Sequence, residues 1–164
     1  MDAKQDILTA GGNITISNNI ISASNFIGFR VETNDESGIT VNPGSPIPFI
    51  SKNDLFTFDT ENAFNDSTYQ YTIPKSGYWN IHVSLFITES PTNNQHRTAL
   101  NVIRNETTYT PCITGQYAEN SENIICVLPL YEGDIIYASP QINALNIFSS
   151  TNNCWFNGHY LAPL

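Results

Sequence analysis

The sequence has few positively charged residues. Only six of its 164 residues are Lys or Arg, against 15 Asp or Glu, which gives a net charge of −9. A nucleic-acid-binding surface needs clustered basic side chains that displace counterions from phosphates. Anionic membrane surfaces attract basic proteins for the same electrostatic reason. The composition therefore excludes nucleic acid as a partner and disfavours binding to an acidic membrane.

Long hydrophobic runs are also missing. No apolar stretch approaches the roughly 18 to 20 residues of a membrane-spanning helix, so we expect no direct membrane insertion. The segment Met1–Asp6 lacks the apolar region of a secretion signal. A longer parent chain would leave secretion open. Hydrophobic residues still make up 40% of the chain and aromatics 12%, which is typical of a globular domain with a core.

Cysteine is scarce and odd in number. The three cysteines are Cys112, Cys126 and Cys154, and their spacing fits no zinc site. Because unpaired cysteine is among the most buried residue types, free thiols in or near the core are the favoured interpretation. One disulfide with one remaining free thiol is the alternative.

Helical periodicity is absent, and apolar residues instead occupy every second position. The clearest run lies between residues 78 and 88, where one face of a predicted strand carries Trp79, Ile81, Val83, Leu85 and Ile87. Shorter alternating runs occur at residues 56–59 and 69–73, and turn sequences such as Asn42-Pro43-Gly44 separate the runs. Many short strands with frequent turns predict an all-β fold, a two-sheet antiparallel jelly-roll sandwich.

The run Ile124–Leu128 is apolar on both faces. Such a strand is either central and covered on both sides, or covered on one side by a partner subunit.

The first 27 residues differ from the rest. Gly11–Ala23 has no aromatic residue and few large ones, so it cannot bury an apolar face alone and needs stacked neighbours or identical chains beside it. We therefore divide the chain into a stalk-like β segment at residues 1–27 and a globular head at residues 28–164.

Several motifs of the head occur in the order found in a known family. They are Phe29–Val31, Tyr69–Trp79, Ala99–Asn105, Leu128–Ile136 and Trp155–Leu161. This order resembles the globular head of complement component 1q and its tumour-necrosis-factor-like relatives. The resemblance implies a jelly roll that assembles as a homotrimer. Trp79 departs from the Phe that family heads often carry, and the loop before Ile124 is unusually rich in Asn.

The opening segment resembles a different class of protein. Leu8–Ile16 followed by Asn19–Ala23 is similar to a shaft repeat of viral and phage fibres. In those shafts a Gly turn joins two short strands, and three chains wrap together.

No catalytic set is evident in the sequence. A nucleophile needs a nearby base and an orienting acid, but the sequence has no Gly-x-Ser-x-Gly motif. Cys154 and His159 lie at an odd separation on one predicted strand, so their side chains point to opposite faces. We therefore expect no enzymatic activity and no cofactor.

The sequence also predicts no metal site. His82, His96 and His159 lack the spacing of paired ligands. A metal on a trimer axis, held by one His from each chain, stays open as an alternative. Acidic pairs at Asp35-Glu36 and at Glu61 with Asp66 offer oxygen ligands of the kind calcium prefers, but solvated turn residues are the favoured interpretation.

Two groups of residues are candidates for binding. The resemblance implies trimers in which one sheet of each protomer packs around the axis and its aromatic residues make the interface, which fits the general enrichment of aromatics at interfaces. We therefore expect two or three of the following to lie there: Trp79, Phe86, Tyr109, Phe148, Trp155 and Tyr160. Loops on a rigid scaffold often carry binding residues. The candidate receptor-binding loop residues are Asn93, Asn94, Gln95, His96, Arg97, Gln116 and Tyr117.

These features together predict the head of a trimeric viral or phage fibre, located at the virion surface. It would bind a host-surface receptor, either a protein or a glycan, with three weak sites providing avidity. One alternative is a secreted, extracellular recognition or ligand domain of a cellular protein with the same fold. The other is a structural cap that nucleates trimerisation of a shaft.

Overall fold

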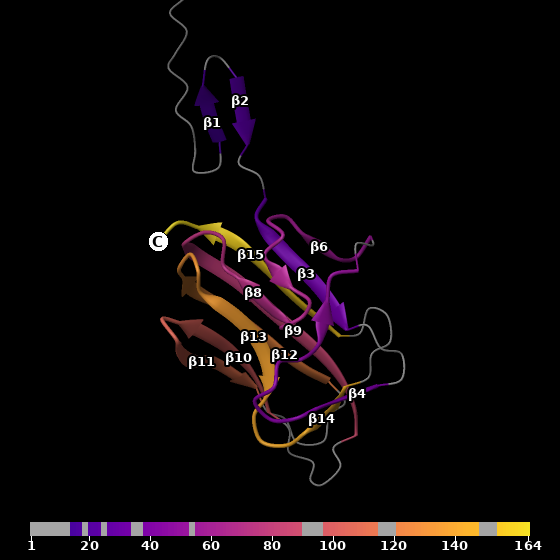
Figure 1. Ribbon diagram of the computed structural model, residues 1–164. Helices are drawn as coiled ribbons and strands as arrows, with labels where there is room; N and C mark the ends of the chain where they lie inside the picture. Colours follow the sequence, from indigo (N-terminus) through magenta and orange to yellow (C-terminus); the bar gives the residue numbers. More distant parts are fainter. Residues whose placement is uncertain are drawn as a thin grey trace, which may run out of the picture.

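A computed structural model describes residues 14–17, 20–23, 26–33, 38–52, 55–89, 97–114, 121–147 and 154–164. Regular structure in these residues consists of β-strands, and none of them lies in a helix. Two antiparallel sheets face each other as a jelly-roll sandwich (Figure 1). The predicted all-β class and two-sheet architecture are therefore confirmed. The described residues contain no helix long and apolar enough to cross a membrane.

The larger sheet has eight strands, and the longest of them, β9, pairs with three neighbours. Its order is β4 (Ile39–Val41), β14 (Leu145–Ile147), β9 (Gly77–Glu89), β15 (Trp155–Ala162), β3 (Gly28–Thr33) and β5 (Phe49–Ile50). Two further strands extend it: β12 (Ser121–Leu130) pairs with β9, and β6 (Phe58–Asp59) pairs with β3.

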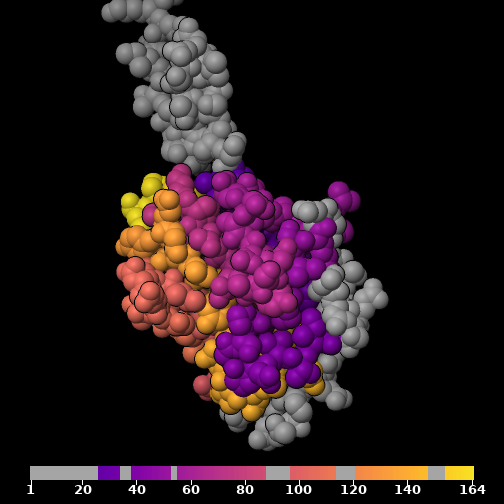
Figure 2. Space-filling model, viewed as in Figure 1, coloured from indigo at the N-terminus to yellow at the C-terminus, as the bar shows by residue number. Residues whose placement is uncertain are grey.

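The smaller sheet has five strands, in the order β11 (Thr107–Thr114), β10 (Thr98–Arg104), β13 (Ile135–Pro140), β8 (Gln70–Thr72) and β7 (Phe64–Asn65). In Figure 2 the purple and magenta atoms of residues 38–75 fill the centre of the visible face, beside the orange and salmon atoms of the strands from β10 to β13. The connection from β4 to β8 therefore forms much of this surface.

The core lies between the two sheets and is rich in aromatic rings. The alternation in β9 is confirmed, because Trp79, Ile81, Val83, Leu85 and Ile87 are all buried. The largest cluster joins strands from both sheets. The ring of Phe29 on β3 stacks on Tyr71 of β8 at 3.9 Å and meets Phe156 of β15 edge-on at 4.9 Å. Buried rings of this size dominate core energetics, so these contacts tie one sheet to the other.

The packing around Gly158 explains why the last sequence motif, Trp155–Leu161, contains a glycine. A Cβ atom at this position would lie 2.6 Å from Cε1 of Phe29 and 2.7 Å from Cδ1 of Ile81. Both distances are far shorter than a carbon–carbon contact. The missing side chain therefore lets two core residues pack directly on the backbone of β15.

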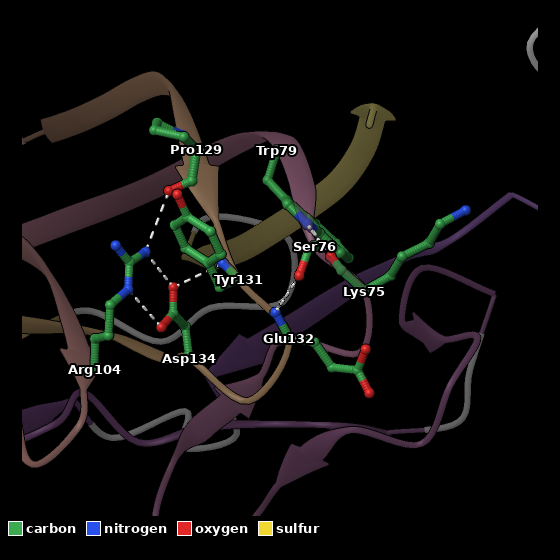
Figure 3. A network of polar contacts seen from close by, with 8 residues as sticks. All are labelled: Lys75, Ser76, Trp79, Arg104, Pro129, Tyr131, Glu132 and Asp134. Carbon is green, nitrogen blue, oxygen red and sulfur yellow. Dashed lines mark hydrogen bonds and ion pairs between the residues drawn. The ribbon is translucent and has the colours of Figure 1, made fainter. Parts of the chain in front are cut away.

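The turn between β12 and β13 is held by an ion pair (Figure 3). Gly133 adopts a φ of +87°, a conformation that glycine accepts readily. The buried carboxylate of Asp134 accepts a hydrogen bond from Arg104 Nε at 2.8 Å and one from the Tyr131 amide at 2.8 Å. The Arg104 guanidinium also lies 4.3 Å from the centre of the Tyr131 ring. Arg104, at the end of β10, thus stabilises the turn that connects β12 to β13.

This turn also contacts the segment that precedes β9 (Figure 3). The Glu132 amide donates a hydrogen bond to Ser76 Oγ at 2.9 Å, and the Gly133 amide donates to the Ile73 carbonyl at 2.9 Å. The indole of Trp79 closes that segment by donating to the Lys75 carbonyl at 3.0 Å. Two motifs that are far apart in the sequence therefore stabilise each other.

The segment ahead of the head contains a short hairpin. β1 (Ile14–Ser17) pairs antiparallel with β2 (Ile20–Ala23), and Ile16 faces Ile21 in the register. These strands form a separate two-stranded sheet. The rest of the predicted shaft repeat, at residues 8–13, lies outside the described residues.

Candidate assembly and binding surface

The outward face of the eight-stranded sheet carries the most distinctive surface of the described molecule. Strands β12, β9, β15 and β3 run side by side there. Residues directly opposite one another across neighbouring strands share a face, so the register defines rows across the sheet. The central row consists of Ile125, His82, Asn157 and Arg30. We call the outward face of these four strands the β12–β3 face.

One edge of the β12–β3 face is apolar. On β12, Ile125 is 68% exposed and Val127 is 55% exposed. Among the described strands β12 pairs only with β9, so it is an edge strand. The interpretation of residues 124–128 as a central strand covered on both sides is therefore wrong. The sequence is apolar on both sides because Ile124 faces the core, whereas Ile125 and Val127 face solvent.

A chain of polar and aromatic contacts crosses the same face. The buried carboxylate of Glu32 pairs with Arg30 at 3.0 Å, and the Arg30 guanidinium lies 5.0 Å from the centre of the Trp155 ring. Trp155 in turn packs edge-on against His82 at 4.1 Å. His82 Nε2 approaches the Asn123 side-chain oxygen at 3.5 Å. The chain thus spans all four strands, from β3 to β12.

The surroundings of His82 favour its neutral form. Partial burial lowers the pKa of His82, the hydrogen bond to Asn123 raises it, and the positive charge of Arg30 lowers it further. The other charged groups on this face are Glu32, which is paired with Arg30, and Lys52, whose ammonium lies 4.0 Å from Glu32. A proton added to His82 would therefore place a second positive charge near Arg30, in a partly desolvated site.

Two of the aromatic residues predicted for an interface lie on the β12–β3 face. Trp155 alternates with the buried Phe156 on β15, and Phe86 alternates with the buried Leu85 and Ile87 on β9. Both Trp155 and Phe86 are half-buried within one protomer. Each therefore retains apolar surface that a second molecule can cover.

The other predicted interface residues lie elsewhere. Trp79 has no exposed surface and packs between Tyr71 and Tyr160, so it belongs to the protomer core and we remove it from the candidate interface. Tyr160 faces the same side as Trp79 in the register and carries the Lys75 ammonium 4.5 Å from its ring centre. Tyr109 lies on β11 of the smaller sheet and is 53% exposed. Phe148 lies outside the described residues.

Most of the predicted receptor-binding residues cannot be placed. Asn93, Asn94, Gln95, His96, Gln116 and Tyr117 lie outside the described residues. Arg97 is described and exposed, just before β10, where its carbonyl accepts a hydrogen bond from the Gln141 amide at 2.8 Å. This bond connects the start of β10 to the turn between β13 and β14.

The described residues offer no cluster of three His, Cys, Asp or Glu side chains that could hold a metal. Asp66 accepts a hydrogen bond from the Ser51 amide at 2.9 Å, which is a structural use of its carboxylate. Asp35 and Glu36 lie outside the described residues. Cys154 is buried, and its sulfur accepts a hydrogen bond from the Phe86 amide at 3.1 Å, so it braces β9 against the start of β15.

The sequence-based alternative that a partner subunit covers one side of Ile124–Leu128 included Ile125 and Val127, but neither was among the candidate site residues. The Arg30–Glu32 pair was not singled out at all. Ile125 and Val127 carried a detectable signal, because they are the excess apolar positions of a strand that needs only one buried face. The Arg30–Glu32 pair carried a weaker signal, the same-face spacing of two opposite charges on one strand.

Comparisons with known proteins support the fold. No protein-family profile and no curated protein sequence matches the chain. Among solved structures, Eiger TNF from S. frugiperda superposes with a TM-score of 0.70 at 14% sequence identity, over 85% of this chain and 94% of that one. Murine APRIL superposes with a TM-score of 0.65 at 9% identity, over 84% of this chain and 100% of that one. The chain therefore has the jelly-roll fold of tumour-necrosis-factor-like domains.

Proposed function

We propose that this chain is a homotrimeric, non-enzymatic recognition domain that binds a protein or glycan receptor outside the cell through its loops. The single observation that carries the proposal is the exposed apolar edge of β12, with Ile125 and Val127 on the β12–β3 face. Two neighbouring exposed aliphatic residues on an edge strand would favour aggregation of a free monomer. A partner subunit that covers them would prevent this.

The composition of the β12–β3 face suits contact with identical chains. It combines aliphatic residues on β12 with the half-buried rings of Phe86 and Trp155. The polar members of its rows, Asn80 and Asn157, can hydrogen-bond across an interface. An apolar centre with amide groups around it is the usual anatomy of a protein–protein contact. The resemblance to tumour-necrosis-factor-like heads also supports a trimer, because such heads assemble as homotrimers.

Trimerisation would present three copies of each loop on one particle. Three sites with weak individual affinity then bind a surface receptor with avidity, because the second and third contacts are intramolecular. The candidate loop residues lie between β9 and β10 and between β11 and β12 in the sequence, so strands of the sandwich hold the ends of both loops.

Light scattering coupled to size exclusion tests the trimer. We expect the wild-type protein to run as a trimer at micromolar concentration. Ile125→Lys should produce monomers, because it places a charge in the centre of the buried contact. Ile142→Lys is the matched control, since Ile142 is 44% exposed in the turn between β13 and β14 and should leave the trimer intact. A monomeric wild type, or a trimeric Ile125→Lys, would overturn the proposed assembly.

Binding is tested separately with fluorescently labelled trimer on candidate cells. We expect saturable binding that unlabelled protein competes away and that Arg97→Ala weakens. Protease treatment of the cells removes a protein receptor and glycosidase treatment removes a glycan receptor, so the two sources are distinguished. Absence of saturable binding to any tested cell type would argue against the recognition role.

A fibre head is the second candidate function. The observation in its favour is the β1–β2 hairpin, which precedes the head and forms a sheet of its own. Under this second proposal, the same trimer lies at the end of a shaft on a virus or phage particle. Peptides of this chain in the mass spectrum of purified particles would support it, whereas a parent gene with a signal peptide and no particle would exclude it.

A further inference from the structure

The sandwich is open along one of its edges. In the described chain β11 pairs only with β10, and β12 pairs only with β9. The two strands come close to each other across the gap between the sheets, but no backbone ladder joins them. A hollow of about 170 Å³ lies in this edge, lined by residues of β10, β11 and β12. It differs from the β12–β3 face, because Leu128 and Leu130 on β12 point inward, between the sheets.

The floor and walls of the hollow are apolar. Val102 on β10 and Leu130 on β12 are both buried and form its floor. Tyr109 and Pro111 of β11 line one side, and Leu128 of β12 lines the other. Tyr109 lies opposite Val102 in the register and is 53% exposed, so its ring lies at the entrance. The hollow therefore offers an apolar interior that a molecule can reach from solvent.

Arg104 lies at one end of the hollow and carries a hydrogen-bond donor that is not in use. Its Nε and Nη2 donate to the Asp134 carboxylate, and Nη2 also donates to the Pro129 carbonyl (Figure 3). The third nitrogen, Nη1, contacts no acceptor in the described part of the chain, and the side chain is 35% exposed. An oxygen atom of a bound molecule can therefore accept a hydrogen bond from Nη1.

The size of the hollow suits a single six-membered ring. A cavity of about 150 Å³ with apolar walls is large enough to bind benzene, and this hollow is slightly larger. An aromatic ring gains more here than a saturated one, because it can meet the Tyr109 ring edge-on or in an offset stack. The walls therefore favour one aromatic ring.

The charges around the hollow favour a neutral ligand. The positive charge of Arg104 is already balanced by Asp134, which is buried and bonded to two of its nitrogen atoms. The chain carries a net charge of −9, so an anionic ligand would be repelled at long range. A cationic ligand would meet the guanidinium itself. A neutral carbonyl oxygen accepts a hydrogen bond without adding a charge to this site.

We propose that each protomer holds a binding site for a small, neutral aromatic carbonyl compound between β10, β11 and β12. The ring of the ligand occupies the apolar interior beside Tyr109, and its carbonyl oxygen accepts a hydrogen bond from Arg104 Nη1. The inference goes beyond the proposed function, because the site lies within one protomer and takes a small molecule, whereas the proposed receptor contacts the loops.

Amide NMR titrations of the isotope-labelled full chain test the site, with benzamide as the probe. Benzamide should shift the signals of Tyr109, Leu128 and Leu130 in a saturable manner, with a dissociation constant of about 1 mM or lower. No saturable shift up to the solubility limit of benzamide, or shifts confined to other parts of the chain, would overturn the proposal.

Three related compounds test the chemistry of the ligand. Cyclohexanecarboxamide keeps the amide but has no aromatic ring, whereas benzoate and benzylamine keep the ring but carry a charge. Each should bind at least about fivefold more weakly than benzamide, because each loses the ring contact or the neutral acceptor. Equal or tighter binding of any of the three would overturn the assigned ligand class.

Variants of the lining test the location. Tyr109→Ser removes an exposed aromatic wall and should weaken benzamide binding at least about fivefold. Val102→Phe places a larger side chain in the floor and should abolish binding, with thermal unfolding to show that the variant is folded. Ile113→Ser is the matched control for Tyr109→Ser, because Ile113 is 55% exposed on the same strand but does not line the hollow. Wild-type affinity in Tyr109→Ser would overturn the site even if Val102→Phe failed to fold.

Light scattering on the same samples separates this result from the proposed assembly. A monomeric protein that binds benzamide would refute the trimer alone. A trimer that does not bind benzamide would refute this site alone.

Discussion

The imidazole of His82 packs edge-on against the indole of Trp155, with ring centroids 4.1 Å apart. The contact lies at the centre of the β12–β3 face, between Asn123 on one side and Arg30 on the other. It places a group that titrates near physiological pH in the surface proposed to be buried between subunits.

The first prediction concerns the pH dependence of assembly. Partial burial in the single chain already lowers the pKa of His82. A subunit contact would desolvate the ring further, so the associated state should favour the neutral ring and lose stability as the pH falls below the ordinary value of 6.5. We expect the apparent dissociation constant of the trimer to rise by about tenfold or more between about pH 7.5 and 5.5. Sedimentation velocity across this range measures the change.

The control for this prediction is the variant His82→Gln, which should remain assembled at acidic pH because glutamine cannot acquire the charge. An acid-resistant wild type, or an unchanged pH dependence in His82→Gln, would contradict the assignment to His82.

The second prediction concerns Glu122, a buried carboxylate on β12. No donor in the described part of the chain meets hydrogen-bond geometry at either of its oxygens. The hydroxyl and amide of Thr98 lower its pKa, but burial is the larger effect, so the pKa is raised. Its protonated form is therefore favoured by folding, and stability from this group is lost as the pH rises. We expect Glu122→Gln to stabilise the protein by about 1 kcal/mol at neutral pH, as measured by urea unfolding. The gain should shrink at acidic pH, and the exposed Glu106→Gln should show none.

The third prediction concerns the ion pair between Arg104 and Asp134. Asp134→Ala should reduce the free energy of unfolding by about 3 kcal/mol, because it leaves a cation and the Tyr131 amide without their acceptor. Arg104→Met should also lower stability, because it leaves the buried Asp134 carboxylate without its counter-charge. We expect a smaller cost, because the hydrogen bond from the Tyr131 amide stays in place. A double-mutant cycle with urea unfolding measures the coupling. Equal effects of the two single substitutions would argue against the additional role of Asp134 in the turn.

The fourth prediction concerns Gly158. Gly158→Ala should lower stability by about 2 kcal/mol or more, because the new methyl group would overlap Phe29 and Ile81. Thermal unfolding monitored by near-ultraviolet circular dichroism also reports the packing of the aromatic core. Asn157→Ala, on the outward face of the same strand, should change stability far less. If Gly158→Ala left the stability unchanged, β15 would have to shift freely against β3 to make room for the methyl group.

The fold could be predicted from the sequence because alternation and turns are local signals. Trp79 and Ile81 to Ile87 revealed the buried face of β9 without any tertiary information, and Asn42-Pro43-Gly44 marked a turn. The order of motifs then supplied the jelly roll, which the structural comparisons confirm.

The surface was harder to predict, because exposure depends on which sheet edge a strand occupies. Chemical type alone placed Trp79 and Trp155 in the same group, although one is buried and the other lies on the outward face. The alternation of side chains along each strand would have separated them. Trp79 lies on the same face of β9 as the buried Ile81, whereas Trp155 lies on the same face of β15 as Asn157. The position of β12 at an edge depends on pairing between distant segments, and no local pattern encodes it.

The position of β15 has a consequence for how the chain is made. This strand follows all the other described strands in the sequence, yet it lies between β9 and β3 in the larger sheet and supplies Phe156 to the aromatic core. A nascent chain that lacks residues 154–164 has a gap in the middle of its larger sheet. The larger sheet therefore cannot be completed before residues 154–164 have been made, and until then the unpaired edges of β9 and β3 expose the nascent chain to aggregation.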